Sequence, residues 1–203
     1  MPKILNKRGT RANLNTLATA NGLSAGEVYL ITDENKIAIG LSSSTYEAFA
    51  KESSNTFTST QTFSGTSTTL AAVLTNAAEK TTVSATAATG TIAYYTSSQS
   101  VLYYTSNASA NWTLNITHSA GTTLNAVMAV GQTITVTHMV TQGTTAFYNN
   151  VVQVDGTVTG VTTKWQGGAP ISGDVNAVDL YTYAIVKTGE STFSVFACIS
   201  KFT

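Results

Sequence analysis

The clearest pattern in this chain is an alternation of apolar and hydroxyl-bearing side chains in its C-terminal half. Within residues 132–140, Ile, Val, His and Val occupy the even positions from 134 onward, and Thr occupies the odd positions from 133 to 137. Residues 112–118 alternate in the same way, with Trp, Leu, Ile and His in one register. A period of two is typical of a strand with one buried and one solvated face. The pattern therefore predicts half-buried β-strands in both segments.

Turn residues between apolar runs predict hairpins in the same half of the chain. Asp155-Gly156 separates two valine-containing runs, and residues 188–191 separate two longer runs that end near the C-terminus. Residues 97–100 separate two pairs of tyrosines. Short turns between strands are typical of antiparallel sheets. We therefore expect residues 91–203 to form an antiparallel β-sandwich or jelly-roll-like domain.

Helix and hairpin signals follow one another in the first fifty residues. Thr10 is suited to cap a helix that ends at Asn21-Gly22, a pair typical of helix C-termini. Apolar runs at 27–32 and 36–41 enclose a polar turn and predict a β-hairpin. Residues 1–52 are therefore expected to form a small α/β-hairpin module. Its apolar content is low for an independent core, so we expect it to need partners.

The segment between these two regions is rich in Thr and Ser. Residues 46–51, just before it, suit either one helical turn or a further strand. We interpret residues 53–90 as an extended connector, in which Phe57 and Phe63 lie in a short quasi-repeat. A single chain would leave these two rings badly covered, whereas three chains side by side would bury them on a common axis. The connector therefore favours a homotrimer.

Charge changes this picture by excluding one class of partner. Only 10% of the residues are charged, far below the usual ~25%, and residues 1–52 hold eleven of the twenty. Ten basic and ten acidic side chains give a formal net charge of zero. Nucleic-acid binding depends on clustered basic residues, so we expect no nucleic-acid partner. A neutral chain also favours self-association.

Targeting signals are not evident in the sequence. The basic N-terminus is followed by no apolar run, so we expect no signal peptide. No stretch approaches the eighteen apolar residues of a membrane-spanning helix, so we expect no membrane insertion. We therefore expect a protein made in a cytoplasm, which stays there or leaves within a larger assembly.

Residues that could carry chemistry are few. His118 and His138 fall in the apolar register of their strands, so we interpret them as packed or interface residues. An alternative is a metal shared by three copies of one of them around a symmetry axis. Asp155 suits a turn, and Cys198 suits a small packing position. No catalytic motif accompanies any of these, so we predict a protein that is not an enzyme and has no cofactor.

Aromatic residues are the remaining candidates for binding. Trp165 precedes Gly167-Gly168, and a Trp in a glycine-rich loop can stack on a sugar, anchor an interface, or fold back on the core. Tyr103 and Tyr104 could complete a stacking platform with it. We therefore predict Trp165, Tyr103 and Tyr104 as candidate glycan or interface contacts.

Two segments resemble known viral proteins. The head, from Lys7 through the hairpin that begins at Gly26-Glu27 and ends at Leu41, resembles N-terminal modules of tailed-bacteriophage fibre and receptor-binding proteins. In those proteins the hairpin belongs to a small trimerising module that helps seat the protein on the virion. The stretch from Ser100 to Gly168 is similar to a domain that recurs in structural proteins of marine and cyanobacterial phages.

The resemblance implies a virion structural protein. One reading is a short homotrimeric tail-fibre-like protein, docked by its N-terminus on tail or capsid proteins, whose outward β-domain binds a host-surface glycan. A second is a capsid decoration or cement protein, or head fibre, with the same anatomy. A third, from a different class, is a free carbohydrate-binding module. The first two place the protein on the virion, and the sequence leaves open whether it lies on tail or head.

Overall fold

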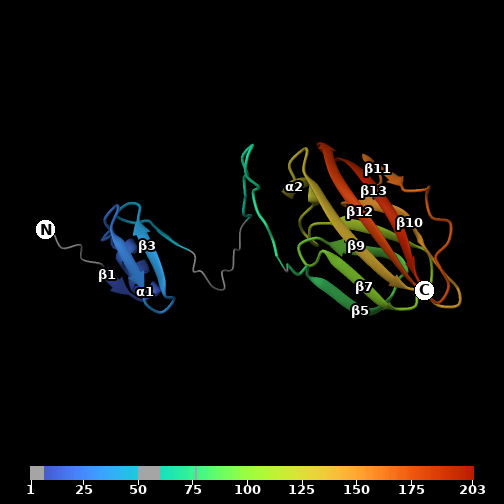
Figure 1. The fold of residues 1–203 in the computed structure, drawn as a ribbon, viewed down its shortest axis with the longest axis horizontal. Helices are drawn as coiled ribbons and strands as arrows, with labels where there is room; N and C mark the ends of the chain where they lie inside the picture. The colour runs from blue at the N-terminus through green and yellow to red at the C-terminus, as the bar shows by residue number, and fades with distance from the viewer. Residues whose placement is uncertain (1–6, 50–59, 76) are drawn as a thin grey trace. The chain divides into compact units, whose positions relative to one another are not determined.

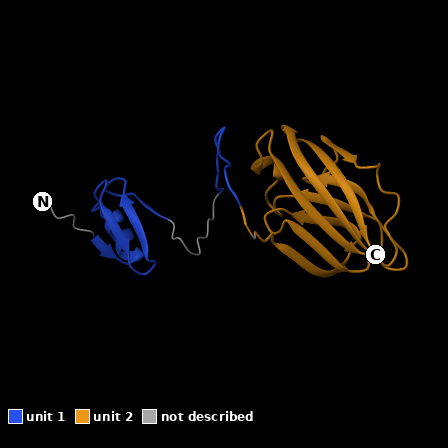
Figure 2. Ribbon diagram, viewed as in Figure 1, with its two compact units in different colours: residues 1–73 blue, residues 74–203 orange. Residues whose placement is uncertain are grey.

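The computed structural model describes residues 7–49, 60–75 and 77–203. The chain is mainly β, as the sequence predicts, and it divides into two compact units, residues 1–73 and residues 74–203 (Figure 2). Each unit has a hydrophobic core of its own. Packing inside each unit therefore stabilises that unit separately.

The N-terminal unit consists of one helix against a four-stranded sheet of order β1-β2-β3-β4 (Figure 1). The pairing of β1 with β2 is parallel, and the other two pairs are antiparallel. The elements are β1 (Lys7–Gly9), α1 (Arg11–Thr19), β2 (Val28–Ile31), β3 (Lys36–Gly40) and β4 (Tyr46–Ala48).

Local signals place these elements where the sequence predicts them. The Thr10 hydroxyl caps α1 by accepting a hydrogen bond from the Asn13 amide at 3.2 Å. The turn between β2 and β3 ends at Asn35, whose φ of 50° lies in the left-handed region that Asn tolerates. The helix and the hairpin are therefore confirmed. Of the two alternatives for residues 46–51, the structure has the strand, β4.

One face of this sheet is covered by α1. Leu14 and Ala18 of the helix are buried with Tyr29, Ile31 and Ala38 of the sheet. Alternate residues of β2 and β3 therefore point away from the helix, toward the opposite face.

An ion pair fastens the helix to the hairpin. The Arg11 guanidinium donates hydrogen bonds to both carboxylate oxygens of Glu34 at 2.8 Å and to the Tyr46 hydroxyl at 2.8 Å. The hydrogen bond from Arg11 lowers the pKa of Glu34 to about 2. This pair therefore stays ionised well below neutral pH.

The C-terminal unit contains two sheets around one core. The larger has order β11-β13-β12-β9-β7-β5, and the smaller has order β10-β8-β6 (Figure 1). The elements are β5 (Thr81–Ala87), β6 (Gly90–Tyr95), β7 (Val101–Ser106), β8 (Trp112–Thr117), α2 (Leu124–Val127), β9 (Thr133–Thr141), β10 (Asn149–Val154), β11 (Val161–Trp165), β12 (Val178–Gly189) and β13 (Thr192–Phe202).

Successive strands from β5 to β10 alternate between the two sheets. The odd-numbered strands β5, β7 and β9 pair in parallel in the larger sheet, and β6, β8 and β10 pair in parallel in the smaller one. The chain thus winds three times around the core, and each winding adds one strand to each sheet. The larger sheet is mixed and the smaller one is parallel, so the prediction of an antiparallel domain was wrong in that respect.

Two predicted hairpins are connections between sheets. The turn at residues 97–100 leads from β6 in one sheet to β7 in the other, and Asp155-Gly156 follows β10 on the way to β11. Both Asp155 and Gly156 have positive φ, so the turn itself is present as predicted. The same turn residues reverse the chain within a sheet or between sheets, so they do not identify the pairing partner.

The hairpin at the C-terminus is confirmed. β12 and β13 pair antiparallel from Val178 opposite Phe202 to Gly189 opposite Thr192. This long ladder joins β11 to β9 across the larger sheet. The first strand of that sheet, β5, lies within residues 53–90, so the sheet begins before the boundary expected at residue 91.

Strand alternation fills the core as predicted. Trp112, Leu114 and Ile116 of β8 are buried against the larger sheet, whose β9 contributes Val136 and Val140. Their neighbours in sequence, mostly Thr and Asn, point away from this core. Period-two patterning therefore determines which face of each strand is buried.

Candidate functional site

The outer face of the larger sheet is the broadest candidate surface. Along the strands of this sheet, Lys164 of β11 is the one charged residue that points outward, as the register of the described strands shows. One row across four strands is apolar, with Val83, Tyr103, Met139 and Leu180 side by side. A sheet face that mixes threonine with apolar side chains and has little charge is suited to contact with another molecule.

A groove of about 410 Å³ lies at one end of this face. Phe196 of β13 is 52% exposed beside it, and it pairs with Lys164 of β11 and Ala184 of β12. The residues that line the groove are Lys164, Trp165, Gln166, Thr182, Ala184, Phe196, Ala197 and Cys198. An aromatic ring with hydrogen-bonding side chains around it can stack on a sugar and bind its hydroxyls.

Trp165 is held by the core at the edge of this groove. Its ring meets those of Tyr181 and Tyr183 edge-on, at centroid distances of 6.3 and 5.9 Å. The side chain is half-buried and packs against the core cluster. The structure shows Trp165 packed against the core, which is one of its three interpretations. Because the side chain also lines the groove, glycan contact stays a prediction.

The two predicted tyrosines point to opposite faces of β7. Tyr104 faces the core and meets the His138 ring edge-on at 5.2 Å, and burial raises its pKa. Tyr103 is half-buried on the outer face beside Met139. Four strand spacings separate β7 from β11, roughly 19 Å. The structure therefore does not bring Trp165 and the tyrosines together on one platform.

Phe196 is an exposed aromatic residue that the sequence interpretation missed. It lies in the solvent register of β13, opposite the register of Phe193 and Val195, which are buried. An aromatic residue at a solvent-facing position of an alternating strand indicates a contact residue. That signal was available in the sequence.

His138 is a packed residue, as predicted. It is fully buried, with the Tyr104 ring at 5.2 Å and the Trp112 ring at 5.9 Å. Desolvation lowers its pKa to about 3, so the ring is neutral at physiological pH. His118 is half-buried, and its Nδ1 lies 3.2 Å from the Thr96 hydroxyl.

Asp155 has a structural role beyond its turn. Its carboxylate accepts hydrogen bonds from the amides of Leu124 and Asn125, at 2.7 and 2.9 Å, where α2 begins. At the other end of α2, the buried Lys187 ammonium donates to the carbonyl oxygens of Asn125 and Met128. Opposite charges therefore satisfy the free backbone groups at both ends of this short helix.

The connector presents large apolar side chains to solvent. Phe63 is 65% exposed, and Leu70, Val73 and Leu74 are 77–82% exposed. Residues 60–75 contain no charged side chain, and Thr66 and Thr69 form a small bridge within them. The prediction for Phe63 in a trimer remains open, and Phe57 lies outside the described residues.

Metal-ligating side chains do not cluster in threes anywhere in residues 7–49, 60–75 and 77–203. Across the same residues, no helix has the length and apolar character needed to span a membrane. Comparison of the chain with protein-family models, with curated proteins and with solved structures gives no match.

Proposed function

We propose that this protein is a bacteriophage virion structural protein, a short homotrimeric fibre attached by its N-terminal unit, with an outward β-domain. The observation that carries the proposal is the exposed apolar series Phe63, Leu70, Val73 and Leu74 within residues 60–75, which contain no charged side chain. Full burial of such a side chain contributes about 1.5–3 kcal/mol. Association of several connectors removes these side chains from water, which a single chain does not do.

The arrangement of the chain supports a fibre over a free enzyme. The two units have separate cores, and the chain between those cores is rich in Thr and Ser, so one unit can dock while the other remains outward. The head carries the resemblance to phage fibre modules, and the neutral outer face of the larger sheet suits contact with a host-surface glycan. We also propose that the C-terminal unit, with two sheets around one core, is a β-sandwich or jelly-roll-like domain.

The trimer is tested by sedimentation equilibrium of the full chain. A mass three times 21.2 kDa at micromolar concentration supports the proposal. A monomer at all concentrations contradicts it. Labelling of the protein on purified particles then decides between a tail fibre and a capsid decoration protein, which has the same anatomy.

A second candidate, a carbohydrate-binding module, is favoured by the groove beside Phe196. The ring and its neighbours Lys164, Gln166 and Thr182 combine a stacking surface with hydrogen-bonding groups. Glycan-array binding that is lost in Phe196→Ala and kept in Val158→Ala, which changes an exposed apolar residue outside the groove, supports this function. If the unaltered protein binds no glycan on the array, the carbohydrate-binding function is contradicted.

A further inference from the structure

The N-terminal sheet has an apolar face that α1 does not cover. Tyr29, Ile31 and Ala38 point toward the helix, so the residues that alternate with them point away. We call this surface the open face. Its apolar residues are Val28, Leu30, Ile37, Ile39 and Phe49.

Three of these side chains are largely in solvent. Leu30 is 41% exposed, and Ile37 and Phe49 are each 50% exposed. Leu30 pairs directly with Ile37, and the Phe49 amide donates to the Ile37 carbonyl oxygen, so the three form one row across the sheet. A continuous apolar row on an otherwise small unit marks a contact surface.

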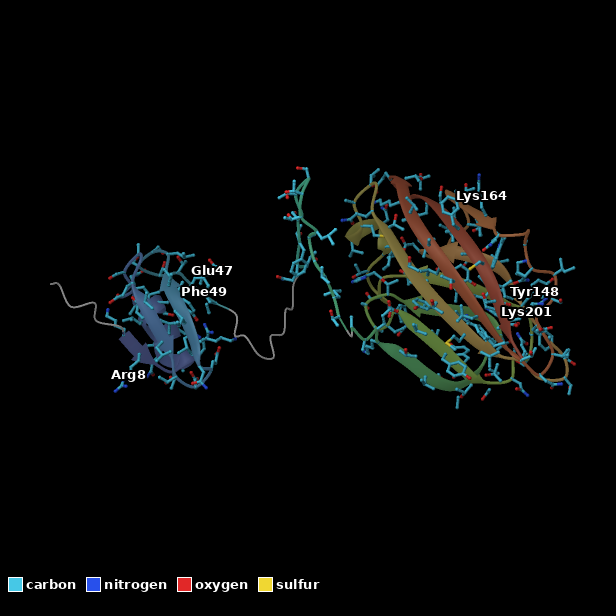
Figure 3. All side chains as sticks on the ribbon, in the orientation of Figure 1. Arg8, Glu47, Phe49, Tyr148, Lys164 and Lys201 are labelled. Carbon is cyan, nitrogen blue, oxygen red and sulfur yellow. The ribbon has the colours of Figure 1, made fainter. Side chains whose placement is uncertain are left out.

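Opposite charges lie on the two outer strands of the open face. Arg8 of β1 lies beside Leu30, and Glu47 of β4 lies beside Ile39. Because the strand order is β1-β2-β3-β4, the two charges lie at opposite edges of the open face. In Figure 3, Arg8 and Glu47 lie on opposite sides of the N-terminal unit, with Phe49 next to Glu47.

Every other charged side chain described in this unit is engaged within it. Lys7 pairs with Glu27 at 3.1 Å, and Glu34 pairs with both Arg11 and Lys36. The Asp33 carboxylate accepts a hydrogen bond from the Arg11 backbone amide. Within residues 7–49, Arg8 and Glu47 are thus the two charged side chains that the unit leaves unpaired, and they have opposite signs.

We propose that the open face is covered by the same face of other copies of this chain, with Arg8 of one copy paired to Glu47 of the next. Around a rotation axis, strand β1 of one copy comes next to strand β4 of its neighbour, and this head-to-tail contact closes a ring. The apolar row then faces the axis, and the charges join adjacent copies. The inference rests on the homotrimer proposed above and assigns its contact surface.

A charge-reversal cycle on the full chain tests the pairing. Arg8→Glu and Glu47→Arg each place like charges at the contact, so each is expected to raise the concentration at which the trimer dissociates about tenfold or more. The double variant restores opposite charges and is expected to return dissociation to within about threefold of the original. Both side chains are exposed, so the fold is retained. A double variant as weak as the single ones overturns the pairing.

The apolar row is tested by Leu30→Lys and Ile37→Lys, with Ile171→Lys as the matched control. All three residues are exposed, and Ile171 lies in the C-terminal unit. We expect the first two variants to shift the trimer to monomer over the concentration range in which the control stays trimeric. Circular dichroism confirms that each variant remains folded.

The outcomes separate this inference from the function on which it rests. A trimer unaffected by Leu30→Lys and Ile37→Lys overturns the open-face contact and leaves the homotrimer standing. A monomeric unaltered chain overturns both. Variants that stay trimeric but no longer attach to particles show that a virion protein covers the face, which also overturns the inference.

Discussion

The two units of this protein satisfy their polar groups in different ways. The N-terminal unit keeps its charges at the surface, where Arg11, Glu34 and Lys36 form a small network. The C-terminal unit instead buries polar side chains, including His138, Asp179 and Lys187, and leaves its broad outer face nearly without charge. The difference shows that low overall charge is a property of one unit. It predicts that acid, core mutation and salt affect the two units unequally.

Acid gives the largest expected difference. The pKa of His138 is about 3 in the folded protein and about 6.5 when unfolded. The unfolded chain therefore binds the proton first, so the stabilisation present above pH 6.5 is lost as pH falls toward 3. At pH 3.5 the loss is about 4 kcal/mol. Both histidines of the chain lie in the C-terminal unit, so we expect that unit to unfold first in acid.

Tryptophan fluorescence measures this effect, because Trp112 and Trp165 both report on the C-terminal unit. Burial raises the pKa of Asp179, which works in the opposite direction at the acid end of the range. His138→Phe is the control, and it should remove most of the pH dependence between 6.5 and 4. An unchanged profile in that variant would show that another group is responsible.

A core truncation gives the next largest effect. Leu114 is fully buried between the sheets, so Leu114→Ala is expected to cost about 2–5 kcal/mol in the free energy of unfolding of the C-terminal unit. Amide hydrogen exchange in α1 should be unaltered, because the N-terminal core is separate. Faster exchange in α1 would mean that the two units are coupled. Leu14→Ala is the reciprocal variant.

Loss of the Asp155 carboxylate is expected to cost about 2 kcal/mol. Asp155→Ala removes the acceptor of the Leu124 and Asn125 amides and places alanine at a φ of 53°. Asp155→Asn keeps an oxygen acceptor and tolerates that φ, so it should cost about half as much. Urea unfolding of both variants measures the difference. Equal losses would assign the effect to the charge alone.

Salt gives the smallest difference. Ions screen surface pairs such as Arg11–Glu34, so added sodium chloride should slightly lower the melting temperature of the N-terminal unit. The C-terminal unit, with its neutral outer face, should show no such decrease. Scanning calorimetry at 0.05 and 0.5 M salt is the measurement. A steep decrease in the C-terminal transition would contradict this account of its surface.

The sequence predicts single elements better than their pairing. Thr10, Asn21-Gly22 and the alternation in 112–118 are local signals, and the helix and strands they predict are present. The turn at Asp155-Gly156 was also recognised, but it joins two sheets. Which strands pair with one another depends on how the two sheets pack across the core, and the residues of a single turn do not determine this.

The candidate surfaces follow the same rule. Tyr103 and Trp165 were recognised as aromatic, but their separation across five strands depends on topology. The open face could have been found from residues 27–32 and 36–41, since both registers of that hairpin are apolar. Which register α1 covers is decided by tertiary packing. β5 was missed because an edge strand of small residues is only weakly periodic.

The alternating windings also determine the order in which this domain can fold. Thr81 pairs with Val101 and Val101 with Thr137, so the parallel ladders close only after long stretches of chain have been brought together. The β12–β13 hairpin needs only a short turn and forms with a much smaller loss of entropy. We therefore expect synthesis of the last strands to precede stable assembly of the first ones. Chains truncated before β12 should remain unfolded and be prone to aggregation.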